Sequence, residues 1–277
     1  MNDNAKGYLY IMAVIFIWGS SYSVTKILEK FISPIYISAL RALVGGIVLL
    51  IIFRKIIYGV KETIAGLLNM AFFLIFLNLG IMYSKNPSLS AVLVYTQPIF
   101  VVILSKFYLK SRITLLQYIG IITGFFGILL TAISTIGFSI GLIFSLLSGF
   151  SWAIGTVYFV RHLANKDIIA LNSYMSLISF PVIISFLPLS HYFEINVSSI
   201  IILIYTTLII QILAWLLWFY AVKYIGPVRS SSLVMLTPIS SFIFTIALMH
   251  VFPNYLQLAG SIFAIIGSLI AQIGRKT

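Results

Sequence analysis

The chain has 277 residues, of which 61% are hydrophobic and only 8% are charged. Soluble domains carry about 25% charged residues and cannot bury this much apolar surface in one core, which excludes an ordinary soluble protein. The net charge of +12 suggests a nucleic-acid partner, but the basic residues lie between apolar stretches rather than in one patch. We therefore expect no nucleic-acid partner and an all-α polytopic protein whose surroundings are a lipid bilayer.

Apolar windows of about 20 residues, the length that a helix needs to cross a bilayer, recur along the chain. There are ten, at roughly residues 8–28, 34–53, 64–84, 87–107, 114–133, 137–160, 168–188, 197–222, 228–249 and 254–273. Thirteen of the 17 Lys and Arg residues lie at the two termini and at every second connection between windows. By the positive-inside rule we expect both termini in the cytoplasm, and we place the protein in the plasma membrane of a prokaryote.

The second half of the sequence repeats the first at an offset of 140 residues. Each half holds five windows, an odd number, so the second half is expected to enter the membrane from the opposite side. This predicts two inverted five-helix repeats, residues 1–135 and 136–277, an arrangement in which a substrate site lies near the midplane between the repeats. Nine identities fall in register without a gap: Pro87/Pro227, Ser90/Ser230, Leu93/Leu233, Val94/Val234, Pro98/Pro238, Leu116/Leu256, Gln117/Gln257, Gly120/Gly260 and Gly127/Gly267.

Small residues follow a tryptophan near the front of each half, in IWGSSYS around Trp18 and in SWAIGTVY around Trp152. Further along the first half, Gly120, Gly124 and Gly127 recur at spacings of three and four, which places them on one face of a helix. Such a face allows two helices to approach closely within a membrane, and we expect this packing role here.

These features together resemble a known family. The ten windows in two halves, the early WG, and the Y…P…S…P(I/V)F run followed by LLQYIGIITGFFGILL are similar to EamA-type transporters of the drug/metabolite transporter superfamily. The resemblance implies a basket of ten helices around a central cavity and alternating access for small metabolites such as amino acids. The family often carries a GE pair before the LLQ helix, whereas this chain has LKSR at 109–112 and HVFP at 250–253.

Arg41 lies inside the second window, about two helical turns after Pro34. One role is that of a counter-charge for a carboxylate substrate. The other is structural, in which the side chain extends toward the headgroups or binds carbonyl groups of a neighbouring helix. Arginine is common at a similar place in the family that the chain resembles and looks structural there, so we assign Arg41 a structural role.

Other polar and aromatic residues within the windows are candidates for a substrate site, because polar groups in a membrane need partners. In the family that the chain resembles, the third, fourth, eighth and ninth spans line the cavity. Pro98 and Pro238 are expected to bend or loosen two helices at matching points and to act in gating. The candidate substrate-binding residues are Trp18, Ser21, Asn78, Tyr83, Tyr95, Gln97, Trp152, Tyr158, Gln211, Trp215 and Thr237.

The sequence disfavours catalysis. It has no cysteine, and its five acids lie at the chain ends or in connections rather than in the middle of a window. It also has no HExxH, GxSxG or Walker A motif, so we expect no enzyme, no metal and no cofactor.

We therefore expect a secondary transporter or facilitator, with export preferred, of small neutral or zwitterionic metabolites such as amino acids. Its partners would be the solute and the lipid bilayer, and a monomer is plausible. Two alternatives remain. One is a non-transporting membrane scaffold or assembly partner, and the other is a proton-coupled exchanger that uses a histidine such as His250.

Overall fold

The computed structural model describes residues 2–83, 93–132, 140–189, 191–250, 252 and 254–273. Within this part of the chain the regular structure is helical, apart from one isolated antiparallel bridge between Ile32 and Phe193. Pro87 and Ser90, which contribute to the repeat, lie outside the described residues.

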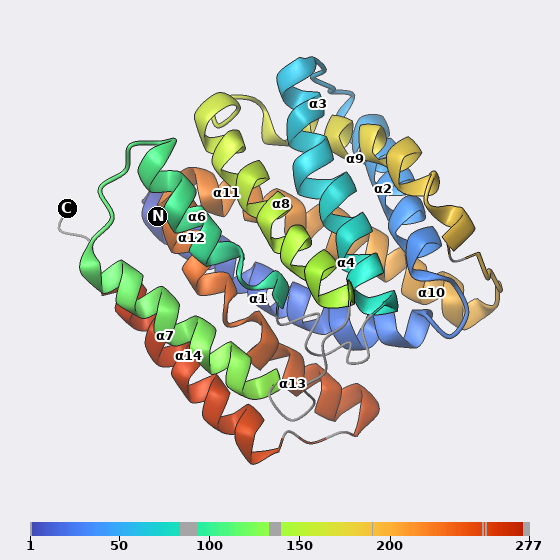
Figure 1. Cartoon of the computed structure of the whole chain (residues 1–277). Coiled ribbons are helices and arrows are strands. Elements are labelled where there is room, and N and C mark those ends of the chain that lie inside the picture. Colours follow the sequence, from blue (N-terminus) through green and yellow to red (C-terminus); the bar gives the residue numbers. More distant parts are fainter. Residues whose placement is uncertain are drawn as a thin grey trace.

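The first half of the chain forms seven described helical elements (Figure 1). The third window is one continuous stretch whose middle is π-helical, because α3, η1 and α4 follow each other without a break. The elements are α1 (Asp3–Leu28), α2 (Pro34–Phe53), α3 (Val60–Gly66), η1 (Leu67–Ala71), α4 (Phe72–Met82), α6 (Gln97–Phe107) and α7 (Leu115–Ala132).

The second half follows a similar plan. A π-helical stretch again interrupts the third long segment of the half, between α10 and α11. The described elements are α8 (Ile140–His162), α9 (Ile168–Ile184), η3 (Leu187–Leu189), α10 (Val197–Tyr205), η4 (Thr206–Leu213), α11 (Ala214–Ile225), α12 (Pro227–Val234), α13 (Thr237–Met249) and α14 (Tyr255–Ile273).

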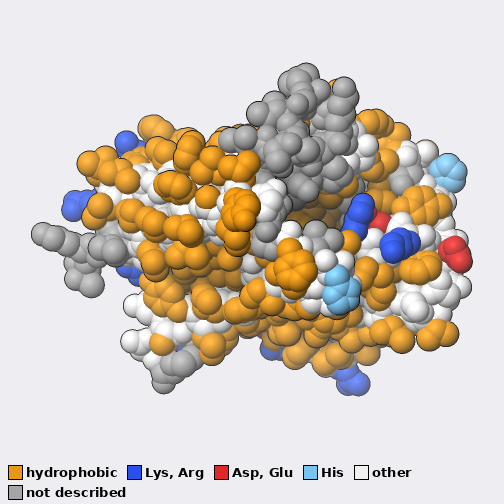
Figure 2. All heavy atoms as spheres, turned by 90° about the horizontal axis from the view of Figure 1, so that it is seen from below, with side chains coloured by type: hydrophobic (Ala, Val, Ile, Leu, Met, Phe, Trp, Pro, Cys, Tyr) orange, Lys and Arg blue, Asp and Glu red, His pale blue; other side chains and the backbone are white. Residues whose placement is uncertain are grey.

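The length and apolar character of these helices fit a membrane. Four shorter apolar helices accompany the long ones, namely Gln97–Phe107, Leu115–Gly127, Ile168–Ile184 and Leu258–Gln272. Apolar side chains cover most of the surface that Figure 2 presents, as expected for a protein in contact with lipid. Within the described part of the chain, six stretches are long and apolar enough to cross a bilayer: Asp3–Leu28, Pro34–Phe53, Val60–Met82, Ile140–His162, Val197–Ile225 and Pro227–Met249.

Local sequence chemistry fixes several helix starts. Pro34 occupies the first turn of α2, where its missing N–H is not needed. Asp167 caps α9, because its carboxylate accepts hydrogen bonds from the N–H groups of Ile169 at 3.0 Å and Ala170 at 3.3 Å. Partial burial alone would raise the pKa of Asp167, but Lys55, whose Nζ lies 3.1 Å away, and the two N–H groups together lower it.

Helices α7 and α14 pack side by side along one edge of the molecule (Figure 1). A side chain added to Gly120, Gly127 or Gly267 would collide with backbone of the other helix. Because higher numbers on α7 meet lower numbers on α14, the two helices are antiparallel, and the glycines have the packing role expected from their spacing. The close contacts are Gly120 with Ala271, Gly124 with Gly267, and Gly127 with Gly260.

The start of α1 and the end of α14 lie at the same end of the bundle. Tyr8 Oη is 3.4 Å from Gln272 Oε1, and Gln272 Nε2 is 3.4 Å from the carbonyl oxygen of Arg229. Lys6 Nζ lies 6.0 Å from the centre of the Tyr224 ring. We call this the basic end, because Lys6 and Arg229 mark it. The opposite end holds the last turn of α1 and the start of α2.

Candidate functional site

A cavity of about 560 Å³ lies between the helices and opens at the end opposite to the basic end. Lys26 and Glu29, at the last turn of α1, lie at its mouth together with Phe252, and the Lys26 side chain is 59% exposed. Figure 2 shows a hollow in the molecular surface with basic and acidic side chains beside it. Pockets of this volume accept small organic molecules.

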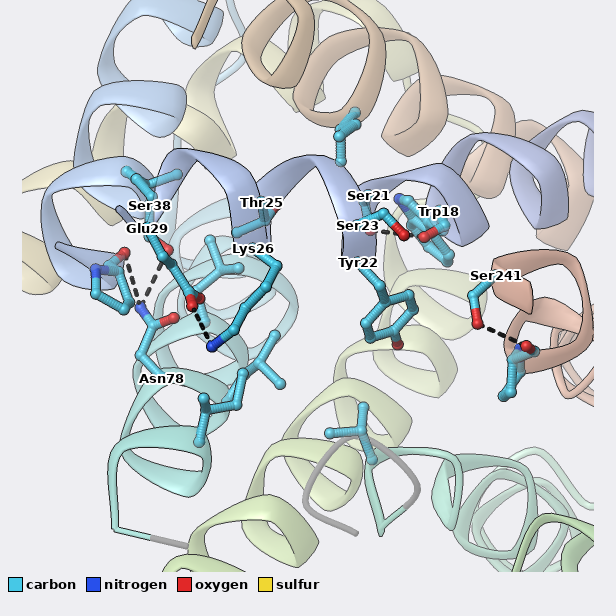
Figure 3. Close-up of a pocket in the computed structure, with 18 of the residues that line it drawn as sticks. Trp18, Ser21, Tyr22, Ser23, Thr25, Lys26, Glu29, Ser38, Asn78 and Ser241 are labelled. Atoms are coloured by element: carbon cyan, nitrogen blue, oxygen red, sulfur yellow. Dashed lines mark hydrogen bonds and ion pairs between the residues drawn. The ribbon is translucent and has the colours of Figure 1, made fainter. Parts of the chain in front are cut away.

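One face of α1 forms a long wall of the cavity (Figure 3). The spacing of its lining residues alternates between three and one, which is the pattern of a single helical face. Trp18 and Glu29 are eleven positions apart, so the wall is about 16 Å long at 1.5 Å per residue. The residues of this face are Trp18, Ser21, Tyr22, Thr25, Lys26 and Glu29.

All four tryptophans of the chain meet at the bottom of this wall. The Trp18 ring centre lies 5.4 Å from those of Trp152 and Trp215 and 5.7 Å from that of Trp218. The Phe73 ring contacts the same cluster, 5.4 Å from Trp152. Among the described residues, no part of α1 before Trp18 lines the cavity, so these rings form its floor and separate it from the basic end.

The wall opposite α1 is polar near the mouth, where α2 and α4 meet. Asn78 Nδ2 donates to Ser38 Oγ at 3.0 Å and to the carbonyl oxygen of Pro34 at 3.3 Å (Figure 3). Arg41 follows on the same face of α2 and is 8% exposed. Its Nη2 lies 3.5 Å from Oε1 of Gln211, while its Nε has no hydrogen-bond partner within the described part of the chain.

The third wall comes from residues beside the two prolines. Tyr95 and Tyr22 line the cavity, and their hydroxyl groups are 2.7 Å apart. Pro238 and Ser241 line it from α13, where Ser241 Oγ donates to the carbonyl oxygen of Pro238 at 2.6 Å. Turns at 95–96 and at 235–236 interrupt the helices directly before Pro98 and Pro238, at positions that the 140-residue offset relates.

The structure therefore brings many of the residues singled out in the sequence to one place. Aromatic rings, an amide and a hydroxyl surround the same space, and they come from both halves of the chain. The predicted residues that line the cavity are Trp18, Ser21, Arg41, Asn78, Tyr95, Trp152, Trp215 and Pro238.

The other predicted residues lie outside the cavity wall. Gln97, Gln211 and Thr237 are each 0% exposed. Gln97 Nε2 is 3.5 Å from Thr156 Oγ1, and Gln211 contacts Arg41 and, at 3.7 Å, the sulfur of Met70. Pro98 is buried at the start of α6.

Two predicted tyrosines also lie away from the cavity. Tyr83 follows α4 and is 46% exposed, with its ring centre 6.1 Å from that of Phe144. The Tyr158 ring centre is 4.5 Å from that of His162 near the end of α8. His250 is exposed at the end of α13 and does not line the cavity.

The sequence reading did not single out several residues that line the cavity. The sequence pattern pointed to some of them, because Tyr22, Thr25 and Lys26 share the helical face of Trp18 and Ser21 at spacings of three and four. Ile37 and Ser38 lie at the same spacings from Pro34 and from Arg41 on α2. The lining residues that were not predicted include Tyr22, Ser23, Thr25, Lys26, Glu29, Ile37, Ser38, Phe73, Phe242 and Thr245.

Two π-helical stretches meet beside the cavity. η1 and η4 begin at Leu67 and Thr206, which are nearly 140 residues apart in sequence. Met70 from η1 contacts Gln211 from η4. π-Helical turns are rare and often occur at functional sites, because they rotate side chains relative to a regular helix. Within the described residues, no group of three acidic or histidine side chains could hold a metal ion.

The fold and the cavity define a polytopic helical membrane protein with a solute-sized space that opens to one end of the bundle. The sequence matches the EamA-like transporter family over residues 5–133 and 139–272. The chain belongs to this family, and its role is therefore in transport.

Two relatives agree with this assignment, and a solved structure shares the fold. An uncharacterized transporter of Acidianus ambivalens is 30% identical over 66% of this chain and 72% of its own length. The uncharacterized transporter YvbV of Bacillus subtilis is 26% identical over 94% of this chain and 89% of its own. A crystal structure with 16% sequence identity superposes with a TM-score of 0.80 over 97% of both chains, so the fold is a known one.

Proposed function

We propose that the protein is a secondary transporter or facilitator that moves small organic metabolites, such as amino acids, across the plasma membrane of a prokaryotic cell. The observation that carries this proposal is the cavity of about 560 Å³, which is lined by aromatic and small polar groups and closed by the tryptophan floor. A scaffold protein has no need for such a space. The open cavity therefore favours transport over the non-transporting alternative.

The proposed mechanism is alternating access between two inverted five-helix repeats, residues 1–135 and 136–277. Three features support the repeats: the antiparallel pair α7 and α14, the matched π-helical stretches, and the matched turns before Pro98 and Pro238. With the basic end in the cytoplasm, the cavity faces the outside in this conformation. Rocking of the halves would close the mouth and open the floor.

A flux measurement tests the transport claim. The purified protein is placed in liposomes that are loaded with unlabelled amino acids and related metabolites, and uptake of each labelled solute is followed. Ser21→Trp puts a large ring into the cavity and should abolish any flux that the wild type shows. Phe16→Trp on the same helix, where the side chain is 47% exposed, is the matched control and should keep the flux.

Wild-type liposomes that exchange no solute faster than protein-free liposomes contradict the proposal and favour the scaffold. Equal flux in the wild type and in Ser21→Trp contradicts the assignment of this cavity as the pathway.

A further inference from the structure

Arg41 is a buried cation in the cavity wall, without an acidic partner among the residues that the structure describes. Its side chain is 8% exposed, and the three ion pairs among the described residues do not include it. Its hydrogen bond within this part of the chain is the long one to Gln211, at 3.5 Å, and its Nε has none. A buried charge is strongly unfavourable unless a counter-charge or several hydrogen bonds compensate it.

The other charges of the cavity do not compensate Arg41. Among the described lining residues, the charged ones are the cations Lys26 and Arg41 and the acid Glu29. Glu29 is already paired with Lys26 at 3.3 Å, and both lie at the mouth (Figure 3). Arg41 lies seven positions beyond Pro34 along α2, about 10 Å deeper. The inner part of the cavity therefore carries a net positive charge.

Arg41 contacts the segment that carries part of the aromatic floor. Its partner Gln211 is one turn before Trp215, which belongs to the floor. The neighbouring wall offers uncharged groups, such as Ser38 and Asn78, whose hydrogen bonds are described above. The inner cavity thus combines one cation with a large apolar and aromatic surface.

We propose that Arg41 binds the carboxylate of the transported solute, and that the protein prefers organic anions whose apolar or aromatic part lies on the tryptophan floor. A guanidinium group donates two parallel hydrogen bonds to a carboxylate, which suits this role better than a simple point charge. No unpaired acid lines the described cavity to receive an ammonium group, so zwitterions and cations bind more weakly than monoanions. This inference depends on the transport function proposed above and specifies its substrate class. It gives Arg41 a binding role in place of the structural role expected from the sequence, and it makes amino acids, which are zwitterions, weaker substrates than organic monoanions.

Four probes of nearly equal size separate charge from shape: 3-phenylpropanoate, 3-phenylpropanamide, phenylalanine and phenethylamine. Affinities of the purified protein are measured by titration calorimetry and by ligand-dependent thermal stabilisation. The wild type should bind the acid about 10- to 100-fold more tightly than the amide, the range expected for hydrogen bonds between charged groups. Phenylalanine should bind less tightly than the acid, and phenethylamine least of all.

Variants then assign the preference to one residue. Arg41→Gln should remove the difference in affinity between acid and amide, while its affinity for the amide stays within about threefold of the wild-type value. Arg41→Lys should retain part of the difference between acid and amide. Lys30→Gln removes an exposed cation at the same end of the bundle, outside the cavity lining, and should keep the wild-type ratio. If Arg41→Gln does not fold, the ratio of acid to amide affinity in the wild type and in Arg41→Lys still tests whether Arg41 binds the carboxylate.

Equal wild-type affinity for acid and amide overturns the inference, and so does an equal loss of both ligands in Arg41→Gln. In both cases flux of other solutes would leave the proposed transport function intact. A wild type that neither binds nor exchanges any of the four probes, but does exchange another metabolite, also overturns the anion preference alone. Absence of all flux contradicts transport itself, and the inference with it.

Discussion

Gln97 and Thr237 occupy matching positions in the two halves, 140 residues apart, and each begins a helix directly before a proline. Both side chains are 0% exposed in this conformation. Oε1 of Gln97 has no hydrogen-bond partner among the described residues, and such a buried oxygen typically destabilises a fold by about 1–3 kcal/mol. The cost of such an unpaired atom in this conformation would be offset if the atom forms a hydrogen bond in the other conformation or with the transported solute.

Gln97→Leu and Thr237→Val should therefore spare the fold and impair transport. We expect the thermal stability of the purified Gln97→Leu protein to stay the same or to rise, since an unpaired buried polar atom is removed. Flux in liposomes should fall in both variants. If stability and flux fall together, the two side chains act in packing instead.

Sequence reasoning identified the floor of the cavity better than its walls. Trp18, Trp152 and Trp215 were candidates because they lie well inside their windows, whereas an aromatic residue that anchors a helix at the membrane surface lies near a window's end. Gln211 was also predicted to bind substrate, but its side chain is buried against Arg41, which is 170 positions away in sequence. It also belongs to a π-helical stretch, which rotates side chains relative to a regular helix. Single-sequence patterns carry neither of these signals.

Among the helices, the α7–α14 pair depends most visibly on a few residues. Gly267 faces the backbone of Gly124 so closely that even a methyl group would force the helices apart. Helix association in a membrane relies on this close approach, because lipid supplies no hydrophobic driving force between helices.

Gly267→Val should consequently destabilise the protein by about 1–3 kcal/mol or more, the usual cost of overpacking. The midpoint of thermal unfolding in detergent and the homogeneity of the purified protein measure this. Leu269→Val, on the same helix but 57% exposed, is the matched control and should unfold like the wild type. A Gly267→Val protein of wild-type stability would mean that the close contact contributes little.

Most elements could be predicted from apolar windows alone. α2, Pro34–Phe53, has the bounds of its window, because a proline starts it and a polar connection follows it. The π-helical stretches η1 and η4 could not be predicted, since isolated polar residues in an apolar run occur in their regular neighbours α4 and α10 as well. For the turn at 235–236, the one indication in the sequence is Pro238, which follows it.

For the molecule as a whole, the main feature is that the cavity reaches one end only. Its lining on α1 runs from Trp18 to the mouth, and α12, which enters from the basic end, does not contribute to it. Ser230, Ser231 and Ser232 on α12 are each 0% exposed. Alternating access requires that the basic end of the bundle open when the mouth of the cavity closes. The small polar side chains of α12 are suited to line the pathway that would then form.

Single cysteines can follow this exchange, because the natural chain contains none. Thr25→Cys lies in the cavity wall and should react with a membrane-impermeant maleimide from the outside. Ser231→Cys should react from neither side at rest and from the cytoplasm while a transported solute is exchanging. Tyr58→Cys, at a 77% exposed position after α2, should always react from the cytoplasm and fixes the orientation. A Ser231→Cys protein that stays unreactive during measured exchange, or labelling of Thr25→Cys from the cytoplasmic side at rest, would contradict alternating access through this cavity.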